Sequence, residues 1–406
     1  MIRSPLNPTE RQTEIALQGS NIASEEIHWI TLKEFCSRVE KQRPDAVVFG
    51  ATGGFIRLCI SRLLQTMKTN MPLLATGISG INVLPENLNI NLRAGCHVYV
   101  AASRKEVLDI RNKQFELGIP FEVALTTIPY LQHNRRLTSA PQSLIEIVVF
   151  TPQPSVPKSY EERKQLLKQL AALKNTFPHL EIFVKLRAIG REKQTHAELW
   201  PFSKLWEELV LDGEVQPNAV LFTDGAMQDF LIDENTLVLT VSSTSAIEAL
   251  DAGCRVGIIS DFGVSRENLN DAFIGSGLIT QISQITPSFA GIADDDWARD
   301  NYFHAETENN LSSAFTTLLQ QRSAGNLPMF SNLPALATEM LFWESVRANL
   351  PRWLSRFLIG AMRPIGRFVK RIGNALIRRT MIALGMHQPA EQLEQGTLDR
   401  VHSSEP

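Results

Sequence analysis

The segment from residue 237 to residue 259 constrains the fold of this chain more than any other. It begins with an apolar, β-branched stretch (237–241), continues through four hydroxyl residues and a run of helix formers (246–250), and ends in a second apolar stretch (256–259). Gly253 stands where a glycine commonly ends a helix. The pattern therefore predicts a strand, a turn, a helix and a strand, which is the repeating unit of parallel α/β folds.

The four hydroxyl residues have the chemistry of an anion site. Such a turn brings hydroxyls and the unpaired N–H groups of a helix start to one point, which suits a phosphate. Glu248 lies four residues after Thr244, on the same helix face, where it can accept hydrogen bonds from a ribose diol. We therefore predict that Ser242, Ser243 and Thr244 hold a phosphate and that Glu248 holds a ribose. The alternative is that one serine is simply the helix N-cap.

Length and composition are those of an ordinary globular protein. The 406 residues, 44% hydrophobic and 20% charged, predict two domains with an ample core and a smaller third segment. The net charge of −3 argues against nucleic acid as a partner. The chain has no apolar run of about 18 residues and no signal-peptide pattern, so a cytoplasmic location is expected.

Residues that build metal, disulfide and nucleophile sites are scattered. The 4 cysteines form no CxxC pair, and the 8 histidines form no cluster. HExxH, P-loop and GxSxG patterns do not occur. We therefore expect no metal and no cofactor.

Two series of short apolar strands alternate with helical segments. The first has strands near 45–50, 72–77, 97–102 and 121–125, and the second has strands near 145–150, 180–185, 219–222, 237–241 and 256–259. Residues 131–142 are polar and form a plausible linker. The series predict an α/β fold of two Rossmann-like lobes with a cleft at the carboxyl ends of the strands. The expected organisation is a polar, partly disordered N-terminus (1–26), an acceptor-side lobe (27–138), a nucleotide-binding lobe (139–325), a basic amphipathic helical tail (326–390) and a disordered end (391–406).

Glycine turns follow the first two strands of the N-terminal lobe. Gly50, Thr52, Gly53 and Gly54 follow the first strand, and Gly77 follows the second. Their spacing is not GxGxxG, so a dinucleotide fingerprint is not indicated. We expect these residues to let the backbone approach an acceptor or a phosphate closely, the alternative being a plain turn between strand and helix.

Cationic residues stand at a strand end of the C-terminal lobe. Lys185 and Arg187 alternate onto one face, and His196 follows in a loop. Together they predict a pocket for a diphosphate or phosphomonoester, against the alternative of a solvated edge. Gly225 and Gly263 mark two more turns at strand ends, and Met227 is either a platform for a base or turn filler.

Several motifs taken together resemble those of an uncharacterised bacterial family of glycosyltransferases. The resemblance covers about residues 27–305. It is carried by 50–54, 185–187, 194–196, 241–249, 261–265, 275–277 and 300–304. The serine pair before a helix is also distantly similar to the phosphate-binding turn of transferases with the GT-B fold that use CMP-sugars, such as polysialyltransferases and Kdo transferases. The His-Pro dipeptide of polysialyltransferases is absent here, since Pro178-His179 has the reverse order and lies before a strand.

The resemblance implies a GT-B fold with a nucleotide-sugar donor on the C-terminal lobe. Ser242, Ser243 and Thr244 would hold the donor phosphate, Glu248 the ribose, and Lys185, Arg187 and His196 the leaving group. The expected reaction is metal-independent transfer of a sugar, with a CMP-linked donor as one candidate, to an envelope polysaccharide or glycolipid. A sugar-nucleotide epimerase and a catalytically degenerate nucleotide-binding assembly subunit are the alternatives.

The C-terminal segment is strongly basic. Residues 345–390 contain nine arginines and lysines and no acidic residue, interleaved with Trp353, Phe357 and Phe368. This pattern predicts an interfacial amphipathic helix, with residues 345–385 held on the anionic inner face of the plasma membrane. The alternative is a packed helix with a solvated basic face.

Overall fold

The computed structural model describes residues 9–17, 22–67, 69–78, 80–81, 87–129, 131, 134–187 and 198–328. All of these residues belong to one compact unit within Met1–Ala348. The predicted basic tail beyond residue 328, the disordered end and His196 lie outside the described residues. Within the described residues, no helix is long and apolar enough to cross a membrane.

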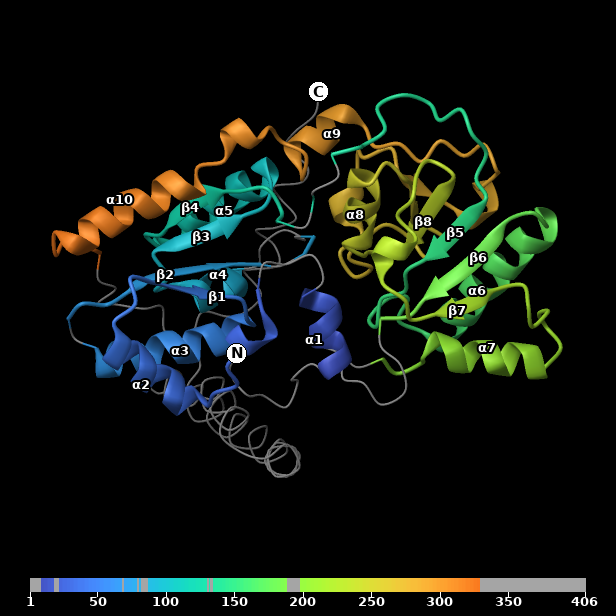
Figure 1. Cartoon of the computed structure of the whole chain (residues 1–406). Helices are drawn as coiled ribbons and strands as arrows, with labels where there is room; N and C mark the ends of the chain where they lie inside the picture. Colours follow the sequence, from blue (N-terminus) through green and yellow to red (C-terminus); the bar gives the residue numbers. More distant parts are fainter. Residues whose placement is uncertain are drawn as a thin grey trace, which may run out of the picture. The chain divides into compact units, whose positions relative to one another are not determined.

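The N-terminal lobe is built on a parallel sheet of four strands in the order β1-β2-β3-β4 (Figure 1). Its strands are β1 (Ala46–Phe49), β2 (Leu73–Gly77), β3 (Val98–Ala101) and β4 (Glu122–Leu125). Its helices are α2 (Leu32–Gln42), α3 (Gly53–Thr66), α4 (Asn87–Arg93) and α5 (Arg104–Leu117). Residues of β2 are buried on both faces, as expected for a central parallel strand covered by helices.

Local capping explains where two of these helices begin. Thr31 accepts a hydrogen bond from the Glu34 N–H while the Glu34 carboxylate accepts from the Thr31 N–H, which is a capping box. The Ser103 hydroxyl accepts from the Glu106 N–H at 3.0 Å, which makes this serine the N-cap of α5.

The C-terminal lobe is built on a parallel sheet of six strands in the order β10-β9-β8-β5-β6-β7. Its strands are β5 (Ile147–Phe150), β6 (Glu181–Lys185), β7 (Leu221–Thr223), β8 (Thr236–Thr240), β9 (Arg255–Ile259) and β10 (Ile279–Thr280). Its helices are α6 (Tyr160–Thr176), α7 (Phe202–Leu211), α8 (Ser245–Asp251) and α9 (Asp295–Asp300). The predicted α/β class with two Rossmann-like lobes is thus confirmed.

The order of the second sheet creates a topological switch point. From β5 the chain continues outward through β6 and β7, then returns to place β8 on the other side of β5 and continues to β9. Helices leaving β5 and β8 therefore diverge, and ligands of open α/β sheets bind at the carboxyl ends of such a strand pair. The turn that follows β8 is the hydroxyl turn singled out in the sequence.

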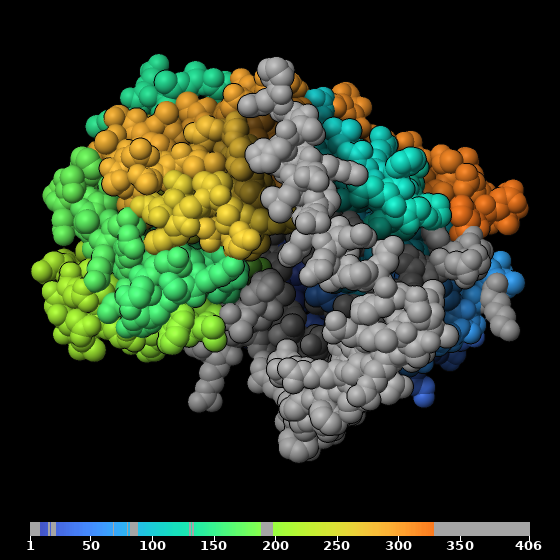
Figure 2. Space-filling view, turned by 180° about the vertical axis from the view of Figure 1, so that it is seen from behind, coloured from blue at the N-terminus to red at the C-terminus, as the bar shows by residue number. Residues whose placement is uncertain are grey.

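One helix belongs to a different lobe from the one expected. Helix α10 (Leu311–Ser323), placed by the sequence pattern in the nucleotide-binding lobe (139–325), packs on the N-terminal sheet instead. Asn310, just before it, accepts a hydrogen bond from the Leu125 N–H of β4 at 2.7 Å. Figure 2 shows the deep orange of α10 adjoining the teal and blue of the N-terminal segments. The residues that contact the sheet follow one helix face: Leu311, Ala314, Phe315, Leu318 and Leu319.

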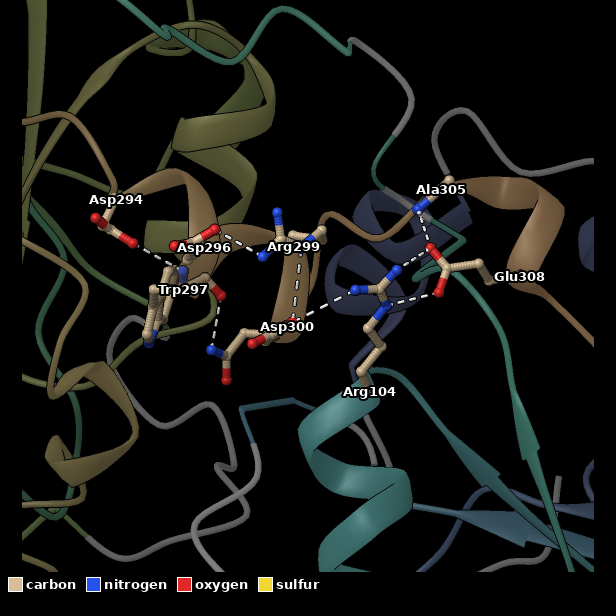
Figure 3. Close-up of polar contacts among 9 residues, drawn as sticks. Arg104, Asp294, Asp296, Trp297, Arg299, Asp300, Ala305 and Glu308 are labelled. Atoms are coloured by element: carbon tan, nitrogen blue, oxygen red, sulfur yellow. Dashed lines mark hydrogen bonds and ion pairs between the residues drawn. The ribbon is translucent and has the colours of Figure 1, made fainter.

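The passage from α9 to α10 is fixed by polar contacts that Figure 3 shows. Arg104 of α5 makes two short bonds to Glu308, Nε–Oε2 at 2.6 Å and Nη2–Oε1 at 2.5 Å, and a longer one to Asp300 at 3.4 Å. The Arg104 guanidinium correspondingly holds the pKa of Glu308 below its usual range. One side chain of α5 therefore binds the end of α9 and the segment leading to α10.

The start of the chain also contains a helix. Residues 10–17, within the segment expected to be polar and partly disordered (1–26), form α1 (Glu10–Leu17). Arg11 of α1 donates from Nη1 to the carbonyl oxygen and to Oδ2 of Asp224, each at 3.4 Å. Arg11 and Asp224 are 213 residues apart in sequence, so no local pattern could predict that they bind each other.

Candidate functional site

The carboxyl edge of the C-terminal sheet gathers most of the predicted donor-side residues. Phe150 pairs with Leu239, and Lys185 pairs with Thr223, so β5, β6, β7 and β8 end near the same level. Lys185 is the last residue of β6, and the hydroxyl turn follows β8 one strand beyond β5. The two predicted groups thus occupy one edge of the sheet, on either side of β5.

The four hydroxyls of the turn do not share one role. The Ser242 hydroxyl donates to the Leu269 carbonyl at 2.5 Å. The Ser245 hydroxyl lies 2.7 Å from the Thr151 hydroxyl at the end of β5. The Ser243 hydroxyl accepts from the Ser245 N–H at 3.2 Å. Three hydroxyls therefore hold the turn in place. The Ser242 hydroxyl, expected to contact a phosphate, gives its proton to the Leu269 carbonyl in this structure.

Two residues keep hydrogen-bond donors that are not used within the turn. Ser243 acts as an acceptor toward Ser245, so its own proton is available to a phosphate oxygen. The hydroxyl of Thr244, the N-cap of α8, makes no capping bond. Among the described residues, the backbone N–H groups of Ser243 and Thr244 also have no hydrogen-bond partner. The unused hydrogen-bond donors of the turn are therefore concentrated at Ser243 and Thr244.

Lys185 and Glu248 form an oppositely charged couple beside this turn. Both side chains are half-buried, and burial lowers the pKa of Lys185 and raises the pKa of Glu248. In each case the charge of the other residue opposes the shift. Yet the described residues provide neither group with an ion pair or hydrogen bond. A cation and a carboxylate thus stand near each other at the switch point without direct pairing, which suits a ligand that carries both phosphate and hydroxyl groups.

The charges of two arginines also affect the pKa of Lys185. After burial and Glu248, the charges of Arg187 and Arg11 are the next influences, and both lower the pKa of Lys185. Arg187 is exposed at the end of the strand. Arg11 is a residue that the sequence analysis missed, since only the tertiary fold carries α1 to the end of β7.

The remaining residues predicted on the donor side make hydrogen bonds within their own loops or pack into the core. The Gly225 N–H donates to the Thr223 hydroxyl at 3.2 Å. Gly263 has a φ of +90°, which favours glycine, and its carbonyl accepts from the Asn270 side chain at 3.1 Å. Met227 is 8% exposed within the core cluster, as turn filler would be.

The glycines predicted on the acceptor side differ in how closely neighbouring atoms approach them. A Cβ on Gly77 would lie 2.6 Å from the Val100 carbonyl oxygen, so close strand packing requires this glycine. A Cβ on Gly53 would lie 2.9 Å from Nη1 of Arg93, whereas one on Gly50 would meet nothing within 4 Å. Thr52 is the exposed N-cap of α3 and makes no side-chain capping bond. Gly54 follows it in the first turn of α3.

One contact joins the turns of the two lobes. A Cβ built on Gly80, in the turn after β2, would lie 3.3 Å from Cγ2 of Thr244. The turn after β2 therefore reaches the hydroxyl turn. Among the described residues, no three His, Cys, Asp or Glu side chains come together as a metal site would need.

Comparison with solved structures finds similar folds at low identity. The complex of Staphylococcus aureus MnaA with UDP is 9% identical, with 81% of this chain and 90% of that chain covered and a TM-score of 0.47. The Neisseria meningitidis UDP-GlcNAc 2-epimerase bound to UDP-GlcNAc is 14% identical, with 80% and 85% covered and a TM-score of 0.40. A mutant of S. aureus TarM in complex with Fondaparinux, α-GlcNAc-glycerol and UDP is 14% identical, with 78% and 58% covered and a TM-score of 0.38.

No curated protein matches the chain. A family model with the description "Putative glycosyltransferase (DUF6716)" matches residues 1–318, which is more than half of the sequence. This match confirms the family of glycosyltransferases that the motifs predicted. The chain therefore belongs to this family, and it is an enzyme of the glycosyltransferase class built from two parallel α/β lobes.

Proposed function

We propose that this glycosyltransferase moves a sugar from a nucleotide-sugar donor to a cell-envelope polysaccharide or glycolipid. The observation that carries the donor assignment is the position of Ser243 and Thr244 at the switch point, next to Lys185 and Glu248. Such a position is the usual ligand site of an open α/β sheet. The lobe that holds it would be the donor lobe.

Each of these groups has a distinct part in the proposed reaction. The N–H and hydroxyl groups of Ser243 and Thr244 would donate to a donor phosphate, and Glu248 would accept from the ribose hydroxyls. The bond between the anomeric carbon and the phosphate oxygen breaks as an acceptor hydroxyl attacks that carbon, and the proton of this hydroxyl passes to solvent. Lys185, Arg187 and His196 would stabilise the negative charge on the leaving phosphate without a metal ion.

The nucleotide of the donor is a further part of the proposal. The similarity of the serine turn to that of CMP-sugar-dependent polysialyl and Kdo transferases makes a CMP-linked sugar one candidate. A nucleoside diphosphate would use the same turn and would bring its second phosphate toward the cationic side chains at the end of β6. The two donor types therefore differ in how strongly they depend on Lys185.

The membrane forms the last part of the proposal. Residues 345–385, with their nine cations and interleaved aromatic side chains, would hold the enzyme on the anionic inner face of the plasma membrane. A lipid-linked or membrane-bound acceptor would then be presented to an enzyme that is already at the surface.

A nucleotide-binding experiment tests the donor site. CMP, CDP, UDP and GDP are titrated calorimetrically into the full chain and into Lys185→Gln, with Lys204→Gln on the exposed face of α7 as the matched control. We expect one nucleotide to bind. A nucleoside diphosphate should bind about tenfold more weakly to Lys185→Gln because a charge-assisted contact is lost, and CMP should lose less. Affinity should be unchanged in Lys204→Gln. Equal affinity in both variants would remove Lys185 from the donor site.

A further inference from the structure

The loop that leaves β5 at the switch point is largely buried. Most of residues 151–158 are shielded from solvent, including Pro152, Pro154 and Pro157. Loops usually run over the surface, because a buried loop has backbone groups that need hydrogen-bond partners. The carbonyl oxygens of this loop therefore need donors from elsewhere in the fold.

Arg163, near the start of α6, supplies these donors. Its side chain is 2% exposed. Its Nε donates to the Pro157 carbonyl at 2.8 Å, and its Nη2 donates to the carbonyls of Gln153 at 3.2 Å and Pro154 at 2.6 Å. The guanidinium lies over the ring of Phe202, 4.7 Å from its centroid. One side chain thus satisfies three carbonyls of the buried loop.

The same guanidinium binds a second segment. Its Nη1 donates to the Trp200 carbonyl at 2.7 Å and to Oε1 of Glu198 at 2.9 Å, just before the start of α7. Arginine has five N–H donors, and all five are used in these bonds. Arg163 therefore supports its neighbours and has no donor left for a phosphate.

The loop after β5 leads directly to the hydroxyl turn. Thr151, its first residue, lies with its hydroxyl 2.7 Å from the Ser245 hydroxyl, and its carbonyl accepts from the Thr240 hydroxyl at 2.9 Å. The Ser245 N–H in turn donates to the Ser243 hydroxyl at 3.2 Å. A short series of bonds therefore connects the loop held by Arg163 to the serine that keeps its own proton available.

We propose that Arg163 is a positioning residue of the donor site. By holding the loop after β5, it keeps Thr151 against Ser245 and fixes where Ser243 and Thr244 meet the donor phosphate. This inference rests on the proposed function, since it takes the hydroxyl turn as the phosphate site. Hydrogen bonds from N–H groups span only about 2.7–3.2 Å between heavy atoms, so a shift of about 1 Å in the turn is enough to lose them.

A second buried arginine in the same lobe provides a matched control. Arg255, at the amino end of β9, is 1% exposed. Its Nη1 donates to the carbonyls of Pro287 at 3.3 Å and Phe289 at 2.9 Å, and its Nη2 donates to the Ser143 carbonyl. Arg163→Lys and Arg255→Lys both keep a positive charge and lose the planar fork of donors, but at opposite edges of the sheet.

The first measurement needs no ligand and follows hydrogen exchange of the full chain by mass spectrometry. The N–H groups of Ser245, Ala246 and Ile247 are bonded to Ser243 or Thr244. In Arg163→Lys these amides should exchange on the order of tenfold faster, because the turn opens locally more often. Urea unfolding corrects both variants for lost global stability. Corrected exchange at the turn that is equal in Arg163→Lys and Arg255→Lys would overturn the positioning role.

A milder pair of substitutions covers the case in which Arg163→Lys does not fold. Thr151→Val preserves the shape of the side chain and removes its contact with Ser245, while the bonds of Arg163 remain. Its control is Thr236→Val at the amino end of β8, where the buried hydroxyl has no partner among the described residues. Faster exchange at the turn is expected in Thr151→Val alone, and exchange equal to that of Thr236→Val would contradict the proposed series of bonds.

Calorimetric titration of CMP, CDP, UDP and GDP connects the turn to the donor. The nucleotide that binds the unchanged chain should bind Arg163→Lys and Thr151→Val about tenfold more weakly, and Arg255→Lys and Thr236→Val within about twofold. Equal affinity in Thr151→Val and Thr236→Val would overturn the positioning of the donor site. Affinity that is indifferent to both Ser243→Ala and Lys185→Gln would instead refute the donor site itself, whereas the exchange result is independent of any nucleotide.

Discussion

At the scale of single residues, the hydroxyl turn separates two serines that look alike in sequence. Ser242 donates its proton to the Leu269 carbonyl, whereas Ser243 keeps its proton available. We expect Ser243→Ala to weaken nucleotide binding about tenfold, because a hydrogen bond to a charged group contributes ~1.5–3 kcal/mol. Ser242→Ala should instead lower the free energy of unfolding by about 1 kcal/mol and change nucleotide affinity less. Calorimetric titration and urea unfolding measure the two effects, and equal affinity losses would contradict this division.

Glu248 gives a residue-scale prediction that depends on pH. Burial raises its pKa above the ordinary value of 4.5, so the folded state holds this proton more tightly than the unfolded state does. The contribution of Glu248 to stability is therefore fully present below pH 4.5 and is lost as pH rises through the raised pKa. Glu248→Gln should accordingly melt higher than the unchanged chain at pH 7.

The difference between the two proteins should shrink as the pH approaches 4.5. Thermal unfolding followed by circular dichroism over this range measures it. A variant that melts lower at pH 7 would show that the attraction of Lys185 outweighs burial. Glu181→Gln, at an exposed position in β6, is the control, and its melting temperature should differ little from that of the unchanged chain.

At the scale of elements, α10 ties the end of the described chain to the N-terminal sheet. Phe315 lies on the face that packs against β2, β3 and β4. We expect Phe315→Ala to lower the free energy of unfolding by about 2 kcal/mol. This loss is smaller than for a fully buried phenylalanine, because Phe315 is only partly buried. Thr317→Ala on the exposed face should cost less than about 0.5 kcal/mol. Denaturant unfolding compares them, and similar values would mean that α10 contributes no packing energy.

The boundaries of most elements followed from the sequence because local signals set them. Helix α6, observed at Tyr160–Thr176, begins where Ser159 and Glu162 form a capping box, a signal that four consecutive residues carry. The strands agree to within a residue or two for the same reason, since apolar runs end where burial ends. The lobe to which α10 belongs could not be inferred, because its apolar face fits either sheet equally well by pattern.

At the scale of the whole molecule, the basic segment 345–385 makes a prediction about the full chain. Electrostatic attraction to anionic lipid is screened by salt, since the Debye length falls to about 3 Å at 1 M. Liposome flotation of the full chain should therefore require anionic lipid, weaken in salt and be lost when the residues after Leu350 are deleted. A truncated chain that floats as well as the full chain would refute membrane attachment through this segment.

The sequence by itself determined the α/β class, the two series of strands, the hydroxyl turn between β8 and α8, and the cationic end of β6. These features depend on residues close together in the chain, where periodic burial and turn chemistry leave a readable pattern. Tertiary structure alone decided that Ser242 binds a carbonyl 27 residues away, that Arg11 reaches Asp224, that α10 covers the N-terminal sheet, and that Arg93 lies against the start of α3. Each of these contacts joins distant segments, and their partners are chosen by the packing of the whole fold rather than by any local preference of the chain.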